Sequence, residues 1–327
     1  MTDPFDIIVL SDRNGRGDID RRLIVTSTLW IKGFPSMRSI VSGISKRKDR
    51  RLTFFFDDGG DSSKWGQSPV DIDDNHVLRV EYPPLTMSGH WNQEGYANIK
   101  NTGSTGKLRR NERRHYSFIY AHIYVSFSTV AITLEGNRNP ASIRGGPLTD
   151  DVYEFSEVVF RWGSSNCKGA EHTLNGTWFT MEAQIIHFNL RYEEIEKCWD
   201  KRDGLAICCY FLQVYQLPAW DEHPLFSKIT DNFTYRVFTE IKYFPFPFSL
   251  EELRELQSKH FYRLYSGSIT TWPYYECATW IIFPEPVRIS ENQAQCFRML
   301  RNKQGTFIKE NYREVQKLNS RVIYYIC

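Results

Sequence analysis

Short runs of aromatic and β-branched residues alternate with Gly, Asn, Asp and Pro from Leu52 to the end of the chain. This pattern is typical of antiparallel β proteins, in which short strands are joined by turns. The run Leu205–Val214 is apolar on both faces, so we expect it in the middle of a sheet that is covered on both sides. The clearest predicted strands are Val152–Trp162, Trp178–Asn189, Leu205–Val214 and Thr279–Phe283.

Two short helices are predicted from the residues at their starts. Ser249–Glu252 matches a capping box, in which the first and last side chains each bond the other's backbone, and opens a helix over Leu250–Lys259. Ser290–Gln293 does the same for a helix that runs to Leu300. The predicted fold class is therefore mainly β, with a large, mostly antiparallel, twisted central sheet and a few short surface helices.

The composition and net charge of the chain limit the kinds of molecule that it is expected to bind. Apolar residues make up 41% of the 327 residues and aromatic residues 15%, which is enough for a sizeable core. The net charge is only +2 and the basic residues cluster locally, at 46–51 and 107–114, so we predict no binding to nucleic acid or to a membrane. Residues 1–52 have poor periodicity and are interpreted as an N-terminal extension of uncertain order.

Seven cysteines are scattered along the chain without the paired spacings of a zinc site or a disulfide framework. The first residues also lack the basic start and the long apolar core of a signal peptide. We therefore predict a cytoplasmic protein with reduced thiols. Two glycosylation motifs, at Asn175 and Asn232, point weakly toward secretion, which is the alternative if the true N-terminus lies elsewhere.

Two of the predicted strands could converge on a small site. Alternate side chains of a strand share a face, so Val159 and Arg161 point the same way, and Gln184 lies on one face of the next strand. A hydrolytic zinc site needs three neutral imidazoles and one open position for water. These strands offer a valine, a guanidinium and an amide instead, and a permanent cation repels zinc.

Seven collinear motifs resemble segments of the α-carbonic anhydrase family. Glu157–Gly163 resembles Gln-Phe-His-Phe-His-Trp-Gly, and Gly169–Gly176 resembles Gly-Ser-Glu-His-Thr-Val-Asp-Gly. Met181–Asn189 resembles Ala-Glu-Leu-His-Leu-Val-His-Trp-Asn, and Ser266–Pro273 resembles Gly-Ser-Leu-Thr-Thr-Pro-Pro. The other three motifs are Gln67–Ile72, Gly145–Leu148 and Asn311–Gln316. Together they cover roughly residues 65–326 in the family's order, which makes the resemblance specific.

The resemblance implies a carbonic anhydrase fold for residues 53–327 and assigns the family's functional positions to residues of this chain. The three zinc-ligand positions fall on Val159, Arg161 and Gln184, and the proton-shuttle position falls on Ser104. Four key imidazoles are therefore absent. Active members of the family use zinc, but for this chain we predict no bound metal and no cofactor.

Other parts of the family's active site are kept. The resemblance makes Thr270 the gatekeeper hydroxyl and Glu171 its carboxylate partner, with Thr271 beside them. Glu182 matches the carboxylate that orients the third ligand, and Glu157 replaces an orienting glutamine. Folding alone could also explain Thr270, Glu171 and Trp280, since buried polar pairs specify structure. The residues that match the wall of the carbon dioxide pocket are Ile186, Ile207, Ile269 and Trp280.

Arg161 is expected to fill the vacated metal position as a cation. A buried arginine must find a carboxylate, and Glu171, Glu157 and Glu182 are the expected neighbours. We therefore predict an internal ion pair that replaces the structural role of zinc.

Three further features bear on the site. Segment 107–129 interrupts what should be a passage between two strands, and is either a functional insertion or an unremoved intron. Trp272 replaces the first proline of the Thr-Thr-Pro-Pro motif and is expected to narrow the pocket mouth. His172 and His187 match family positions with structural roles, so no alternative metal site is predicted.

The resemblance leaves three hypotheses for function. The favoured one is a non-catalytic carbonic anhydrase-related protein, a monomer that acts as a binding or regulatory module for an unidentified protein partner. The second is a zinc-dependent carbonic anhydrase (a carbonate dehydratase, hence a lyase) that hydrates carbon dioxide to bicarbonate, which would need a zinc site built from other residues. The third is a degenerate product with no retained role.

Overall fold

A computed structural model of the chain describes residues 10–13, 19–22, 66–91, 96–101, 130–135, 140–215, 222–233, 242–243, 249–254, 261–302 and 304–326. The chain separates into two compact units, Met1–Gly60 and Asp61–Cys327. In the first unit, β1 (Leu10–Arg13) and β2 (Ile19–Arg22) pair antiparallel. Ser104 and segment 107–129 lie outside the described residues, so the structure places neither of them.

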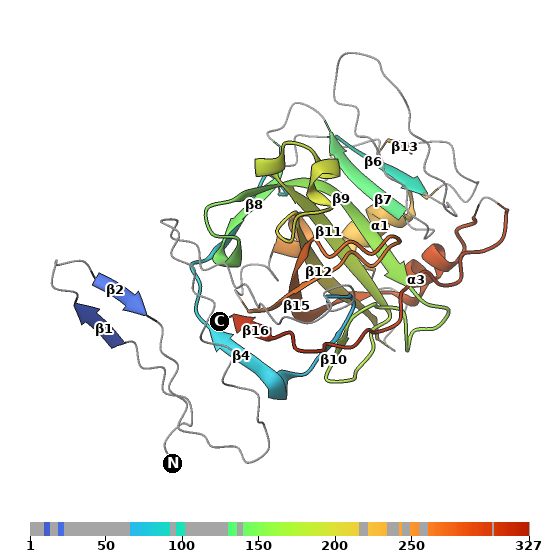
Figure 1. Cartoon of the computed structure of the whole chain (residues 1–327). Coiled ribbons are helices and arrows are strands. Elements are labelled where there is room, and N and C mark those ends of the chain that lie inside the picture. The colour runs from blue at the N-terminus through green and yellow to red at the C-terminus, as the bar shows by residue number, and fades with distance from the viewer. Residues whose placement is uncertain are drawn as a thin grey trace. The chain divides into compact units, whose positions relative to one another are not determined.

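A large mixed sheet, with twelve strands among the described residues, forms the framework of the second unit (Figure 1). Its main path runs through β13 (Lys242–Tyr243), β6 (Tyr96–Asn101), β7 (Val130–Glu135), β9 (Val152–Trp162), β11 (Met181–Asn189), β12 (Leu205–Val214), β15 (Ala278–Ile289), β14 (Tyr262–Gly267), β16 (Ile323–Ile326) and β4 (Val77–Val80). Two more strands, β5 (Leu85–Ser88) and β8 (Ser142–Gly145), pair with each other, and β8 also pairs with β9. Among the described strands of this sheet, only β12–β15 and β16–β4 pair in parallel. The predicted, mostly antiparallel sheet is therefore confirmed, and it is mixed in detail.

A short parallel pair and a few helical turns complete the described elements. The pair consists of β3 (Asp71–Ile72) and β10 (Thr173–Leu174). The α-helices are α1 (Pro224–Thr230) and α3 (Glu291–Arg298). The 3-10 turns are η2 (Asp74–His76), η3 (Gly146–Leu148), η4 (Leu190–Tyr192), η5 (Ile195–Cys198) and η6 (Glu251–Leu253). Within the described part of the chain, no helix has the length and apolarity needed to cross a membrane.

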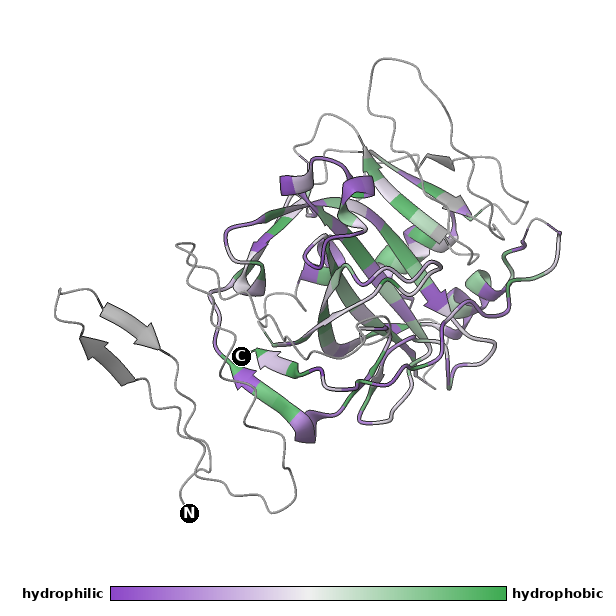
Figure 2. Cartoon of the chain, in the orientation of Figure 1, coloured by the Kyte–Doolittle hydropathy of each residue, from purple (hydrophilic) through white to green (hydrophobic). Residues whose placement is uncertain are grey.

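Strand β12 carries apolar side chains on both faces, as its sequence predicts. It has the predicted bounds and lies between β11 and β15. Because side chains alternate along a strand, β12 contributes to two separate hydrophobic cores. Ala206, Cys208, Tyr210 and Leu212 enter one core, and Leu205, Ile207, Cys209 and Phe211 enter the other. Figure 2 shows the hydrophobic residues concentrated along the central strands.

The other three predicted strands also form, and two of them differ from the prediction in their bounds. Strand β9 matches the prediction, and β11 begins at Met181 rather than Trp178. Strand β15 runs from Ala278 to Ile289, whereas the predicted strand runs from Thr279 to Phe283. Two prolines, at 284 and 286, lie in the added part, where the residue cannot donate a ladder hydrogen bond. The strand passes them through a register shift against β12, which accommodates residues that cannot donate to the ladder.

The two predicted capping boxes have different outcomes. At the start of α3, Ser290 and Gln293 make both reciprocal bonds (3.0 and 3.1 Å), so that prediction is confirmed, although the helix ends at Arg298 rather than Leu300. The capping box at Ser249 is wrong, because the described turn is capped by Leu250 without a side-chain bond. There the carboxylate of Glu252 binds Lys228 (2.8 Å), whereas a capping box needs it to accept the backbone N–H of Ser249. Residues 255–259 of that predicted helix lie outside the described part of the chain.

Candidate functional site

Strands β9 and β11 bring the three expected ligand positions together. In the register of these strands, Val159 lies opposite Gln184, and Arg161 lies opposite Glu182. Residues directly opposite each other across an antiparallel pair present their side chains on the same face. All four side chains are buried. The structure thus places a guanidinium, an amide and a carboxylate beside a valine on one buried face of the sheet.

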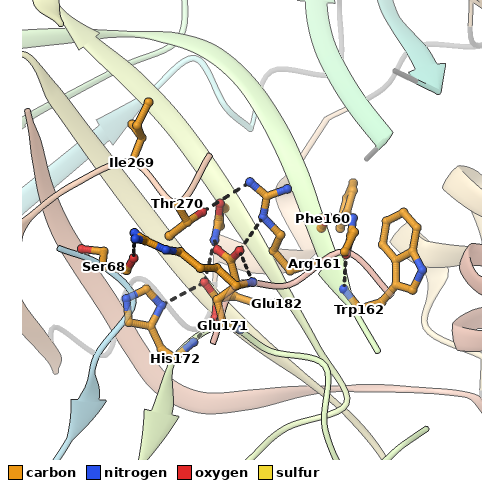
Figure 3. A network of polar contacts seen from close by, with 12 residues as sticks. Ser68, Phe160, Arg161, Trp162, Glu171, His172, Glu182, Ile269 and Thr270 are labelled. Atoms are coloured by element: carbon orange, nitrogen blue, oxygen red, sulfur yellow. Dashed lines mark hydrogen bonds and ion pairs between the residues drawn. The ribbon is translucent and has the colours of Figure 1, made fainter. Parts of the chain in front are cut away.

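Arg161 forms an ion pair with Glu171, one of its three expected partners (Figure 3). The Arg161 Nε atom lies 3.1 Å from Glu171 Oε1, and both side chains are at most 4% exposed. The Arg161 Nη2 atom donates to the hydroxyl of Thr270 at 3.4 Å. The guanidinium therefore lies between the carboxylate and the hydroxyl that the sequence pairs with each other.

Glu171 collects donors from several elements. Its Oε1 accepts the backbone N–H of Arg313 (3.0 Å), its Oε2 accepts the side-chain amide of Gln184 (2.6 Å), and the nearby Thr270 hydroxyl acts to lower its pKa. Burial raises the pKa of Glu171, the Arg161 charge opposes that rise, and the nearby Glu182 adds to it. The Glu171 carboxylate is thus the centre of a polar network that joins Arg161, Gln184 and Arg313.

Glu182 belongs to a second set of bonds, behind Glu171. Its Oε2 accepts the backbone N–H groups of Glu171 and His172 (2.9 and 2.8 Å), and its Oε1 lies 3.0 Å from His172 Nδ1. Burial acts to raise the pKa of Glu182, but the His172 charge and these hydrogen bonds lower it to about 2. His172 Nε2 in turn lies 2.7 Å from the hydroxyl of Tyr265, which fixes the ring. Glu182 and His172 therefore hold each other in place, and Glu171 remains as the carboxylate of Arg161.

The expected ligand positions do not fit a zinc ion. Val159 offers no donor atom, and the Arg161 guanidinium has no lone pair to give. The Gln184 amide nitrogen donates to Glu171 and Glu182, at 2.6 and 2.9 Å. Because a catalytic zinc takes three protein ligands with free lone pairs, these side chains form an ion-pair network rather than a donor set for zinc.

A different group of potential metal ligands lies nearby, and its third member was not predicted. His172, Glu182 and Cys209 are buried and each has a donor atom within 4.8 Å of the others. Burial raises the pKa of Cys209 well above its ordinary value and Glu182 adds to that rise, which keeps the thiol protonated. A metal would need the thiolate and the carboxylate oxygens that already accept hydrogen bonds. The group fits a hydrogen-bonded cluster better than a metal site.

The expected pocket wall forms a row across three strands. Ile186 on β11 lies opposite Ile207 on β12, which lies opposite Trp280 on β15. Ile207, Ile269 and Trp280 are buried in one hydrophobic core and Ile186 packs against it. The Trp280 indole donates to the Ser268 carbonyl (2.9 Å), which fixes its orientation. The structure thus brings all four wall residues to the face that carries Arg161.

The residues at the expected pocket mouth are more exposed. Thr271 is partly buried, and the Trp272 side chain is 52% exposed. The guanidinium of Arg313 stacks on the Tyr274 ring, with 3.8 Å from its central carbon to the ring centre. Arg313 lies in a quoted motif, but nothing in its local pattern predicts this contact, because the two residues are far apart in the chain.

His187 takes part in a buried histidine pair that the sequence did not predict. Its Nε2 lies 2.8 Å from the Nε2 of His90, and neither side chain is exposed. His90 lies outside the quoted motifs, so its partner could not be found from local pattern. The pair holds β11 against the segment around His90, away from Arg161.

Comparison with known proteins agrees with this fold. Residues 59–327 match the family model for eukaryotic-type carbonic anhydrases. A mouse protein, carbonic anhydrase 7, is 32% identical over 200 residues, which cover 60% of this chain and 73% of the mouse protein. The matched family region contains the whole network around Arg161.

Proposed function

Because this chain belongs to the eukaryotic-type carbonic anhydrase family, we propose that it is a carbonic anhydrase-related protein without zinc-dependent catalysis. In this proposal the domain keeps the family fold and acts as a binding or regulatory module for a protein partner. The protein is a cytoplasmic monomer in this proposal. Active members of the family use zinc, so the proposal depends on what the chain offers in place of the zinc ligands.

The observation that carries the proposal is the ion pair between Arg161 and Glu171 at the expected ligand position. A zinc ion at this position would lie beside a buried guanidinium, which repels it and cannot coordinate it. Moving Arg161 out would leave Glu171 buried without its cation, which is a large energetic cost. The network therefore supports a domain that is held together without the metal.

The alternative is a zinc-dependent carbonic anhydrase that hydrates carbon dioxide to bicarbonate. The group of His172, Glu182 and Cys209 is the observation that favours it, because these residue types bind zinc. The group would have to lose its hydrogen bonds and a thiol proton, and it lies within the buried core rather than at an open position. We therefore rank this alternative second.

The test is the zinc content of the full chain, purified without chelators, together with its rate of carbon dioxide hydration. We expect far less than one zinc per chain and no hydration above the uncatalysed rate. Stoichiometric zinc with measurable hydration would establish the alternative. A protein that binds zinc only when Cys209 is present, judged with Cys209→Ser, would identify the buried group as the site.

The proposed binding role, the monomeric state and the cytoplasmic location each need a separate measurement. A degenerate protein with no retained role would bind no partner. We expect the intact chain to capture a partner protein in a pull-down, and the same partner to bind the chain when both proteins are purified. In size-exclusion chromatography the chain alone should elute as a monomer. Cell fractionation tests the cytoplasmic location. If none of the captured proteins forms a complex with the chain after purification, the hypothesis of a degenerate protein is favoured.

A further inference from the structure

The two-residue turn that follows β10 consists of Asn175 and Gly176. Leu174 and Thr177 flank this turn and exchange two backbone hydrogen bonds, of 3.1 and 2.9 Å. Both central residues have a positive φ, of 52° and 72°, as in type I′ turns, in which Asn-Gly is a preferred pair. Both residues are also exposed, so water has access to the turn.

An asparagine that precedes a glycine is a chemically labile pair. The Gly176 backbone nitrogen attacks Asn175 Cγ, so that a C–N bond forms, the attacking nitrogen loses its proton and the side-chain nitrogen leaves as ammonia. Water then opens the cyclic imide: its hydroxyl joins one of the two carbonyl carbons, its proton returns to nitrogen, and aspartate or isoaspartate results. Glycine allows the ring to close because it has no Cβ to block the approach. Asparagine is accordingly counted among the thermolabile residues of proteins.

Hydrogen bonds engage both of the reacting groups in the folded chain. The nitrogen that would attack, Gly176 N, donates its N–H to Asp71 Oδ1 at 2.9 Å. In the side chain that would be attacked, Asn175 Oδ1 accepts the backbone N–H of Asp74 (2.8 Å) and Nδ2 donates to Asp74 Oδ2 (3.3 Å). A carboxylate beside the Gly176 N–H also disfavours the loss of its proton, because a second negative charge would form next to it. Cyclisation therefore requires the turn to open first.

The same turn fastens β10 to β3. The backbone N–H of Asn175 donates to the Ile72 carbonyl at 2.8 Å, beside the parallel pairing of the two strands. An aspartate at position 175 cannot donate to Asp74 and brings a second carboxylate toward it. An isoaspartate adds a methylene group to the backbone of a turn that has only two residues. Either product weakens the attachment of β10, which begins two residues after Glu171.

We propose that Asn175 is a latent deamidation site, which the folded chain holds unreactive through Asp71 and Asp74 and which loosens β10 from β3 once it is converted. The co-reactant is water and the second product is ammonia. The inference goes beyond the proposed function and does not depend on it, because neither a metal nor a protein partner takes part.

The first experiment follows deamidation of the full chain at mildly alkaline pH, by peptide mapping with mass spectrometry, in buffer and in urea. In urea, the chain's other Asn-Gly pair, Asn14–Gly15, reports the intrinsic rate of this dipeptide. We expect Asn175 to react at least about tenfold more slowly in buffer than in urea, because the turn must open before the reaction. Equal rates of Asn175 conversion in buffer and in urea would overturn the inference.

Two variants separate the Asp71 contact from general loosening of the turn. Asp71→Ala removes the acceptor of the Gly176 N–H and should raise the rate in buffer about fivefold, because one hydrogen bond that keeps the turn closed is lost. The matched control is Thr173→Val, which removes the other hydrogen bond to Asp71 Oδ1 (2.6 Å) and leaves the Gly176 contact in place. Thermal unfolding shows beforehand that both variants are folded. Equal acceleration in the two variants, or none in Asp71→Ala, would overturn the role of Asp71, and the comparison with urea decides the inference if Asp71→Ala does not fold.

A third variant, Asn175→Asp, reproduces one product of the reaction. Hydrogen exchange of the peptide over residues 171–177 should be about tenfold faster in this variant, because β10 is held less firmly. Asn75→Asp adds the same charge at another exposed asparagine, outside the turn, and is the matched control. Unchanged exchange in Asn175→Asp, or an equal change in the control, would show that conversion of Asn175 does not loosen β10.

Discussion

At the scale of single residues, the ion pair between Arg161 and Glu171 is the feature that separates this site from a zinc site. Strand alternation places Arg161 and Val159 on one face, so the absence of imidazoles there could be predicted from sequence. The carboxylate that pairs with Arg161 could not be predicted in this way, because Glu171 reaches the site from the loop before β10. The contacts of Arg313 and Cys209 also depend on packing between distant segments.

Replacing the arginine alone should not create a zinc site. In Arg161→His the chain gains one imidazole, but Val159 and Gln184 still supply no ligand, so we expect zinc well below one per chain by elemental analysis. The matched comparison is the triple variant Val159→His, Arg161→His and Gln184→His, in which Glu171 and Glu182 remain to orient the ligands. The triple variant should bind about one zinc. Stoichiometric zinc in the single variant would contradict our account of the site.

At the scale of elements, sequence pattern predicted the central strands well and the element ends poorly. Strands β9 and β12 have the predicted bounds because their apolar alternation is continuous. The end of β15 was missed because the register shift past its prolines depends on the neighbouring strand. The capping box at Ser249 was wrong because Lys228, from α1, competes for the glutamate. The local sequence pattern does not predict an element's end where a contact with a distant residue sets that end.

The buried histidine pair of β11 should make stability depend on pH. Burial lowers the pKa of His187 to about 4, although a bond to the Ala206 carbonyl opposes the shift. Unfolded His187 titrates near 6.5, so the unfolded chain binds more protons between these values and stability falls on acidification. This group alone should cost about 2 kcal/mol between pH 7 and pH 5.

Urea unfolding at both pH values measures this effect. His187→Gln should lose about 2 kcal/mol of the pH dependence, because glutamine does not titrate. The comparison variant is His76→Gln, at a side chain that is 79% exposed and lies beside Asp73. It should lose far less of the pH dependence than His187→Gln, because exposed ion pairs contribute little to stability. Identical pH dependence in His187→Gln and the unchanged chain would show that the pair does not carry the effect.

At the scale of the whole molecule, two hydrophobic cores pack on the two faces of β12, and the Arg161 network lies on the face of one of them. In the proposed function this network needs no metal. A protein stabilised by a bound metal loses that stability when a chelator removes the ion. We expect the midpoint of thermal unfolding of the full chain to change by less than about 2 °C with an excess of chelator. The triple-histidine variant, loaded with zinc, provides the positive control and should lose several degrees under the same treatment. A comparable loss in the unsubstituted chain would mean that a metal supports the fold, and the buried group of His172, Glu182 and Cys209 would then be the first place to look for it.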